Sequence, residues 1–282
     1  MIIDVDTNKK FKTFMIINES FKCPANCPFC TAKITKWEKT NHDWNNLGEK
    51  LKFLYSRNMK FENITISGNG EPALIGTNTL EYIIFEYRKY NDMFDYARFQ
   101  SCGEIFLHED KWNLVKDFNF EITRLYVDPI KNSKGLEYDI GYENLNNFKK
   151  SKIMFNLSLL NERYNYIVDD IKDLINAYPN VTSITAKILN VNTLDETEIN
   201  SKHSQWIIKN AIPKSDSNKI VEILSDNFEQ AKGYDDFTDR YEWVYKGIPI
   251  ILYARRADYG TANIVYYEGN LTDYHFNTLN FI

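Results

Sequence analysis

This sequence has few cysteines, no long apolar run and no excess of positive charge. Four cysteines in 282 residues are too few for the disulfide framework that holds a small secreted scaffold together. No apolar run approaches the roughly 18 residues that suggest a membrane-spanning helix. The net charge of −5 gives no overall attraction to phosphate groups, which disfavours nucleic acid as a partner.

The first residues carry no targeting signal. No charged and then apolar leader precedes the first predicted strand, so we expect a cytoplasmic protein with no membrane partner. Thiols stay reduced in that compartment, where a metal cluster can be assembled on them. A chain of 282 residues is long enough to bury a full hydrophobic core.

Three of the four cysteines lie in one short stretch, as Cys23, Cys27 and Cys30, directly after the apolar run 14–17. Closely spaced thiolates hold iron–sulfur clusters. Three thiolates leave one metal position open to a small molecule, unless a distant residue such as Cys102 or a His fills it. A structural zinc site usually has four ligands in two closely spaced pairs, and the second pair is missing here. The Cys-x3-Cys-x2-Cys spacing therefore favours an iron–sulfur cluster over zinc.

A second motif, the segment 68–72 with the sequence Gly-Asn-Gly-Glu-Pro, follows a predicted strand. Glycines let the backbone approach a ligand closely, and a carboxylate such as that of Glu71 accepts hydrogen bonds from an ammonium group. The segment is also compatible with an ordinary turn. Its position behind the three cysteines favours a binding role.

Together the two motifs resemble those of the radical S-adenosylmethionine superfamily. The cysteine spacing, with the aromatic Phe29 before the third cysteine, is similar to the family's cluster motif. The resemblance implies an oxygen-sensitive four-iron four-sulfur cluster held by Cys23, Cys27 and Cys30, with S-adenosylmethionine as the second cofactor.

The Gly-x-Gly-Glu segment is similar to the family's Gly-Gly-Glu motif. By this resemblance the methionine amino group of S-adenosylmethionine is received by Glu71 and by the backbone of Gly68, Asn69 and Gly70.

Strand and helix patterns alternate as far as residue 200. Strands are predicted at 11–19, 61–67, 96–101, 121–127, 152–159 and 181–189, and helices at 43–58, 78–90, 108–118, 142–150 and 164–178. This alternation predicts an α/β fold with a parallel sheet and right-handed crossovers. The family's core is a partial six-stranded (β/α)6 TIM-like barrel, and we expect residues 1–200 to form it.

The pattern changes after the sixth strand. Residues 201–282 are expected to form a small α+β extension that contacts substrate or a partner. Its predicted helices are 203–211 and 218–230, and its predicted strands are 241–245, 248–255 and 263–267. The extension contains no cysteine, which predicts an enzyme with a single cluster.

Polar residues at the carboxyl ends of the strands are the remaining site candidates, because these ends face the active site in such barrels. Asn156 and Ser158, on the fifth strand, are expected to bind the ribose or the methionine carboxylate of S-adenosylmethionine. Cys102, after the third strand, is either an inert buried thiol or a hydrogen-atom donor to a substrate radical.

The resemblance implies an enzyme that cleaves S-adenosylmethionine reductively and abstracts hydrogen from a small-molecule or peptide substrate, with an electron donor such as flavodoxin or ferredoxin. Three alternatives stay open. They are an activase for a glycyl-radical enzyme, an enzyme that modifies RNA or nucleosides, and a metal-binding interaction module without catalysis. The net charge disfavours the second, and the many β/α units disfavour the third.

Overall fold

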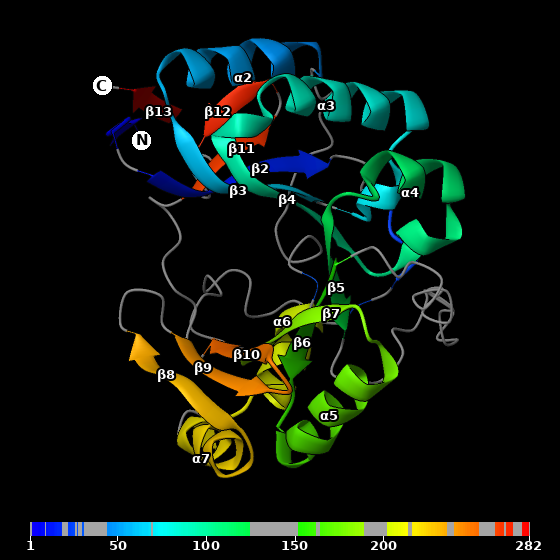
Figure 1. Ribbon diagram of the computed structural model, residues 1–282, viewed down its shortest axis with the longest axis vertical. Helices are drawn as coiled ribbons and strands as arrows, with labels where there is room; N and C mark the ends of the chain where they lie inside the picture. The colour runs from blue at the N-terminus through cyan, green and yellow to red at the C-terminus, as the bar shows by residue number, and fades with distance from the viewer. Residues whose placement is uncertain are drawn as a thin grey trace. The chain divides into compact units, whose positions relative to one another are not determined.

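The computed structural model describes residues 2–8, 10–18, 22–25, 27, 30, 44–68, 70–124, 152–161, 164–188, 202–213, 216–235, 240–253, 263–267, 269–272 and 278–281. The chain forms two compact units (Figure 1). The first comprises Met1–Cys23, Trp37–Phe120 and Asp258–Ile282, and the second comprises Pro24–Lys36 and Glu121–Ala257.

The first unit is a sheet with helices packed against it. Its strands are β1 (Ile2–Val5), β2 (Lys10–Asn18), β3 (Lys60–Gly68), β4 (Phe94–Ser101), β11 (Asn263–Tyr267), β12 (Asn270–Thr272) and β13 (Thr278–Phe281). They are ordered β1-β13-β12-β11-β2-β3-β4, and β11, β2, β3 and β4 pair in parallel. The helices are α2 (Leu47–Ser56), α3 (Thr77–Lys89) and α4 (Glu109–Val115), with short 3-10 helices η1 (Trp44–Asn46), η2 (Pro72–Leu74), η3 (Asn91–Met93) and η4 (Glu104–Leu107).

Apolar residues at helical spacing hold the helices of the first unit against its sheet. Leu47, Leu51 and Leu54 of α2 are fully buried, and their spacing places them on one stripe of the helix. Figure 1 shows α2 and α3 running along the same side of β2 and β3.

The two faces of this sheet differ in chemistry because side chains alternate along a strand. Ile64 and Ile66 of β3 are buried on one face. Asn63 and Thr65 are buried on the other, where the Thr65 hydroxyl donates to Asn63 Oδ1 at 2.6 Å and Asn63 Nδ2 reaches Thr13 Oγ1 at 3.2 Å. One face is therefore apolar and the other carries satisfied polar groups.

The second unit has a mixed sheet. Its strands are β6 (Lys152–Leu159), β7 (Val181–Ile188), β8 (Glu229–Asp235), β9 (Arg240–Tyr245) and β10 (Ile248–Tyr253), and its helices are η6 (Tyr164–Tyr166), α5 (Ile167–Ala177), α6 (Lys202–Asn210) and α7 (Ser217–Asn227). The order is β6-β7-β10-β9-β8, with β6, β7 and β10 parallel and β10, β9 and β8 antiparallel. Strand β5 (Asn119–Arg124) has residues in both units.

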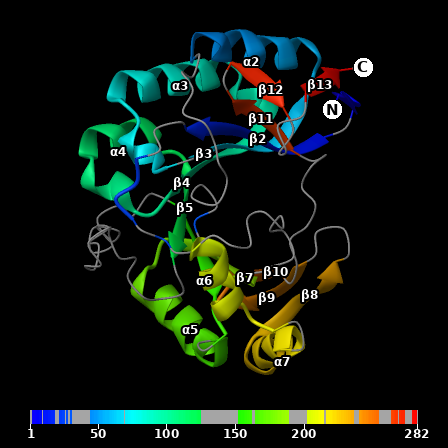
Figure 2. The same ribbon diagram turned by 180° about the vertical axis from the view of Figure 1, so that it is seen from behind.

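Helices α5 and α7 cover the apolar face of the second sheet, as both views show (Figures 1 and 2). Trp243 of β9 is fully buried on this face, and its Nε1–H donates to Ser225 Oγ of α7 at 3.2 Å. Phe155 of β6 packs its ring 5.5 Å from that of Tyr178, just after α5. The helices thus leave the opposite face of β6 and β7 for polar residues.

The structure confirms the α/β class and every predicted strand, with ends that shift by up to two residues within the described part of the chain. The predicted helices are confirmed except 142–150, which lies outside the described residues. Closure of the sheet into a partial barrel stays a prediction, as does the boundary at residue 200, which falls in the undescribed segment 189–201. Among the described residues, no helix combines the length and the apolar character needed to cross a membrane.

The pairing partners of the C-terminal strands do not follow from the sequence pattern. Strand β10 pairs in parallel with β7 of the second unit, and β11 pairs in parallel with β2 of the first. The C-terminal residues therefore contribute strands to both units.

Candidate functional site

Glu71 links two loops at the carboxyl ends of β2 and β4. Its carboxylate accepts hydrogen bonds from the Cys102 N–H at 2.7 Å and the Ser101 hydroxyl at 2.8 Å. It also accepts from the Ala73 N–H at 3.0 Å, which caps the short helix η2. The Glu71 N–H donates to the Lys22 carbonyl at 2.8 Å. One residue therefore holds the segment before Cys23 and the segment around Cys102.

Burial has the largest effect on the pKa of Glu71. The residue is 2% exposed, and this burial raises the pKa of the carboxyl, while hydrogen bonds from Cys102, Ala73 and Ser101 oppose the rise. The Cys102 thiol is a further donor to the carboxylate. A carboxylate has about four acceptor positions, so donors of this chain fill them. The predicted role of Glu71 toward an amino group stays a prediction, and a ligand would share or displace one of these donors.

Cys102 follows the carboxyl end of β4, the position that the sequence predicts, and it is buried. Its thiol is in hydrogen-bond contact with the thiol of Cys23 and with Glu71. The contact with Cys23, then burial, then the Glu71 charge raise the pKa of the Cys102 thiol, which is therefore protonated at neutral pH. The next residue, Gly103, has φ +107°, a conformation that side chains disfavour, and the turn there directs the chain into η4.

The three predicted cluster ligands all lie among the described residues, and none of them forms a disulfide. Cys23 is exposed, and Cys27 and Cys30 are half-buried. The Cys30 N–H donates to the Cys27 carbonyl at 3.3 Å, so these two residues share one turn. In the described part of the chain, no three His, Cys, Asp or Glu side chains lie close enough together to hold a metal ion. Phe29 lies outside the described residues.

The predicted glycine segment follows β3 directly. Gly68 has φ +149°, which side chains rarely adopt, so a glycine is needed where the strand turns toward Glu71. Asn69 lies outside the described residues, and Gly70 is half-buried. Gly68 therefore adopts a backbone conformation that favours glycine, as the motif leads one to expect.

Asn156 and Ser158 lie in the second unit on the face of β6 that α5 does not cover. Both are buried. Asn156 Nδ2 donates to Glu121 Oε1 of β5 at 3.0 Å. Because a carboxylate only accepts hydrogen bonds, this contact fixes the orientation of the amide. Asn156 Oδ1 then has no hydrogen-bond partner among the described residues, and a buried acceptor in this state is suited to a donor on a ligand.

Sequence reasoning missed Glu121 and Lys187 in this group. The Glu121 side chain is 7% exposed, and its Oε1 lies 4.0 Å from the Lys187 ammonium on β7. In the strand register Lys187 pairs with Ser158, so both lie on the same face. Only the alternation of polar residues on neighbouring strands could have suggested this group.

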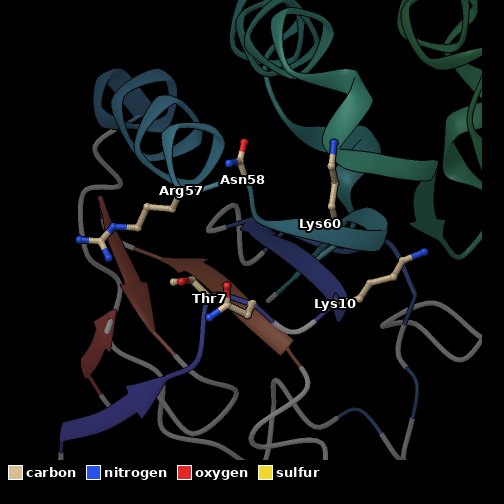
Figure 3. Close-up of a pocket in the computed structure, with 6 residues that line it drawn as sticks. Thr7, Lys10, Arg57, Asn58 and Lys60 are labelled. Carbon is tan, nitrogen blue, oxygen red and sulfur yellow. The ribbon is translucent and has the colours of Figure 1, made fainter.

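A hollow of about 380 Å³ lies elsewhere in the first unit, lined by Thr7, Asn8, Lys10, Arg57, Asn58 and Lys60 (Figure 3). Lys10 and Lys60 are the first residues of β2 and β3 and pair in register, so the hollow is at the opposite strand ends from Cys23 and Glu71. The three cations point away from one another (Figure 3). The Lys10 ammonium binds Asp95 at 2.5 Å, and Lys60 donates to the Asp92 carbonyl at 3.0 Å. The three cations therefore do not form a single positively charged site in the hollow.

The fold is similar to that of two solved structures of anSMEcpe, both with bound AdoMet. The native protein with bound AdoMet matches with a TM-score of 0.55 and 16% identity, over 76% of this chain and 59% of that one. The hexahistidine-tagged protein with bound AdoMet matches with a TM-score of 0.50 and 16% identity, over 77% of this chain and 62% of that one.

The likeness to anSMEcpe is one of fold. The present chain spans about three fifths of the length of these structures. No family model matches the sequence, and no curated protein matches it. The arrangement of strands is therefore shared with anSMEcpe, while activity and ligands must be argued from this chain's own residues.

Proposed function

We propose that this chain is a radical S-adenosylmethionine enzyme with one four-iron four-sulfur cluster. The proposal rests on two sequence motifs and a fold that occur together in this chain. A Cys-x3-Cys-x2-Cys stretch follows β2, and a Gly-x-Gly-Glu turn follows its parallel neighbour β3. Both occur in a chain whose fold is similar to that of an enzyme solved with bound AdoMet.

The donor set fits an iron–sulfur cluster in its chemistry. Cys23, Cys27 and Cys30 are thiols outside any disulfide, with partial or full exposure, and thiolates are the usual ligands of such clusters. We assign these three residues as the cluster ligands. The chemistry that a bound cluster supplies is the one-electron cleavage of S-adenosylmethionine, which yields the radical that abstracts hydrogen from the substrate.

Glu71 and the Gly68–Gly70 backbone are proposed to orient the methionine end of S-adenosylmethionine. Glu71 brings the carboxylate, and its hydrogen bonds to Ser101 and Cys102 fix the position of that carboxylate. Rigid support of this kind keeps a binding group in place before the ligand arrives.

Asn156 and Ser158 are proposed to bind the ribose or the methionine carboxylate. Glu121 acts as a positioning residue, because it receives the Asn156 amide N–H and so turns Oδ1 toward a ligand donor. The substrate is proposed to be a small molecule or a peptide, and electrons are proposed to come from a flavodoxin or a ferredoxin in the cytoplasm.

Anaerobic reconstitution with iron and sulfide tests the cluster and the activity separately. Wild type should bind about four irons per chain, the number in the cluster type of the family, and should convert S-adenosylmethionine to 5′-deoxyadenosine under strong reductant. Replacement of Cys23, Cys27 or Cys30 by Ala should remove both the iron and the product.

Cys102→Ala is the matched control, because it removes the fourth cysteine of the chain and none of the proposed ligands. It should keep wild-type iron content. Tight zinc binding by the wild-type chain, or full iron content in the chain with all three substitutions, would show that the proposal is wrong. A chain that holds the cluster without forming 5′-deoxyadenosine would support the non-catalytic alternative.

A further inference from the structure

Cys23 and Cys102 are distant in sequence and adjacent in the first unit. Their thiols are in hydrogen-bond contact. Glu71 enforces this approach from both sides, because its N–H binds the Lys22 carbonyl and its carboxylate binds the Cys102 N–H. Two backbone segments tied to one residue have little freedom to separate.

The two thiols differ in access. Cys23 is exposed and Cys102 is buried, so a dissolved oxidant reaches Cys23 first. The Ser101 hydroxyl, itself bound to Glu71, accepts from the Gly103 N–H at 2.9 Å. The turn after β4 therefore holds Cys102 in place behind Cys23.

We propose that Cys23 and Cys102 form a reversible disulfide when no cluster occupies the thiols. The cross-link would join the segment after β2 to the carboxyl end of β4. It would form by thiol–disulfide exchange with a small-molecule disulfide such as oxidised glutathione.

The exchange balances in two steps. The Cys23 thiolate attacks one sulfur of oxidised glutathione, giving a Cys23–glutathione mixed disulfide and one reduced glutathione. The Cys102 sulfur then attacks the Cys23 sulfur and expels the second glutathione. The proton of the Cys102 thiol passes to the leaving glutathione thiolate. Two thiols are oxidised, and one disulfide molecule is reduced to two thiols.

The consequence of the cross-link rests on the proposed function. If Cys23 is a cluster ligand, the disulfide removes one of three ligands and prevents reassembly of the cluster until a dithiol reduces it. It also protects Cys23 from irreversible oxidation to sulfinic and sulfonic acids. Formation of the bond itself does not depend on the cluster.

The competing links are those between neighbours in sequence, because Cys27 and Cys30 lie close to Cys23 along the chain. Trypsin distinguishes the possibilities. It cuts after Lys22 and Lys33, which leaves the three clustered cysteines in one peptide, and after Arg98 and Lys111, which leaves Cys102 in another. A Cys23–Cys102 bond joins two peptides, whereas a disulfide between two of the three closely spaced cysteines stays inside one peptide.

The experiment uses the full chain without iron. It is incubated anaerobically with oxidised glutathione, blocked with N-ethylmaleimide, digested and analysed by mass spectrometry. Free thiols should fall from four to two, the two peptides should be joined, and Cys27 and Cys30 should carry the label. Dithiothreitol should restore four thiols and the capacity to take up iron.

Two variants complete the test. Cys27→Ser should keep the cross-link, and Cys102→Ser should stop at a glutathione adduct on Cys23. A labelled Cys102 together with a link inside the 23–33 peptide would overturn the proposal. Normal iron uptake by a fully cross-linked chain would leave the bond intact and instead show that Cys23 is not a ligand, which is a failure of the proposed function alone.

Discussion

At the scale of single residues, Glu71 has more than one task. The sequence motif predicts that the Glu71 carboxylate binds a ligand. The structure shows that it also has a structural task, since donors from Ala73, Ser101 and Cys102 converge on it. Such a buried network stabilises the fold only while each donor keeps its acceptor. Replacement of the Glu71 carboxyl group should therefore affect both the fold and S-adenosylmethionine binding.

Glu71→Gln should lower the free energy of unfolding by about 1–3 kcal/mol, because an amide NH2 would face the Cys102 N–H and leave a buried donor without an acceptor. Urea unfolding of the iron-free chain, followed by circular dichroism, measures the change. Glu62→Gln is the control, since Glu62 lies exposed on β3, the strand that precedes Glu71, and should shift stability by no more than about 0.5 kcal/mol. Equal stability of Glu71→Gln and wild type would contradict the network.

The same variant gives a pH prediction. Burial raises the pKa of Glu71 above the ordinary value of 4.5, so the folded chain holds this proton more tightly than the unfolded chain. Stability from protonated Glu71 is fully present below the unfolded pKa and is lost as the pH rises through the raised folded pKa. The stability advantage of wild type over Glu71→Gln should therefore shrink as the pH rises above about 4.5, the ordinary pKa of the carboxyl. An advantage that grew with pH would mean that the hydrogen bonds outweigh burial.

At the scale of secondary structure, β7 shows how one strand serves two environments. Ile184 is fully buried on the helix-covered face, and the adjacent Ser183 is buried on the other. Ser183 Oγ has no hydrogen-bond partner among the described residues. One strand thus contributes both to the apolar core and to the polar face that includes Asn156.

Ile184→Ala should cost about 2–5 kcal/mol of stability, because it leaves a cavity in the core. Ser183→Ala, one residue away, should be neutral or stabilising, because it removes a buried hydroxyl that makes no hydrogen bond to the described residues. Thermal unfolding of both variants compares the two faces directly. Equal losses would mean that both side chains lie in the packed core.

The elements were predictable and the contacts between them were not. Alternating apolar patterns gave β6 at its observed bounds, and helical spacing gave α5. The cysteines and the glycine segment were recognisable because each motif is local in sequence. Glu121 and Lys187 were missed because the contacts of Glu121 with Asn156 and with Lys187 depend on the register of three strands, which no local pattern encodes.

At the scale of the whole molecule, the C-terminal strands contribute to both units. Ile264, Val265 and Tyr266 of β11 are almost fully buried beside β2, and Ile250 and Leu252 of β10 are fully buried, with β10 paired to β7. Without these strands β2 and β7 would each present an unpaired edge. This arrangement tests the predicted boundary at residue 200, because a separable extension would leave a core able to fold alone.

A chain ending at residue 200 should fail to unfold cooperatively, because it lacks the neighbours of both β2 and β7. A chain ending at residue 257 keeps β8, β9 and β10 and should retain the second unit while the first loses β11, β12 and β13. Amide hydrogen exchange in the longer chain should show protection in β6 and β7 and rapid exchange in β2, whereas the full chain protects all three. Cooperative unfolding of residues 1–200 alone would show instead that the core is an independent domain and that the C-terminal strands only cover its edges.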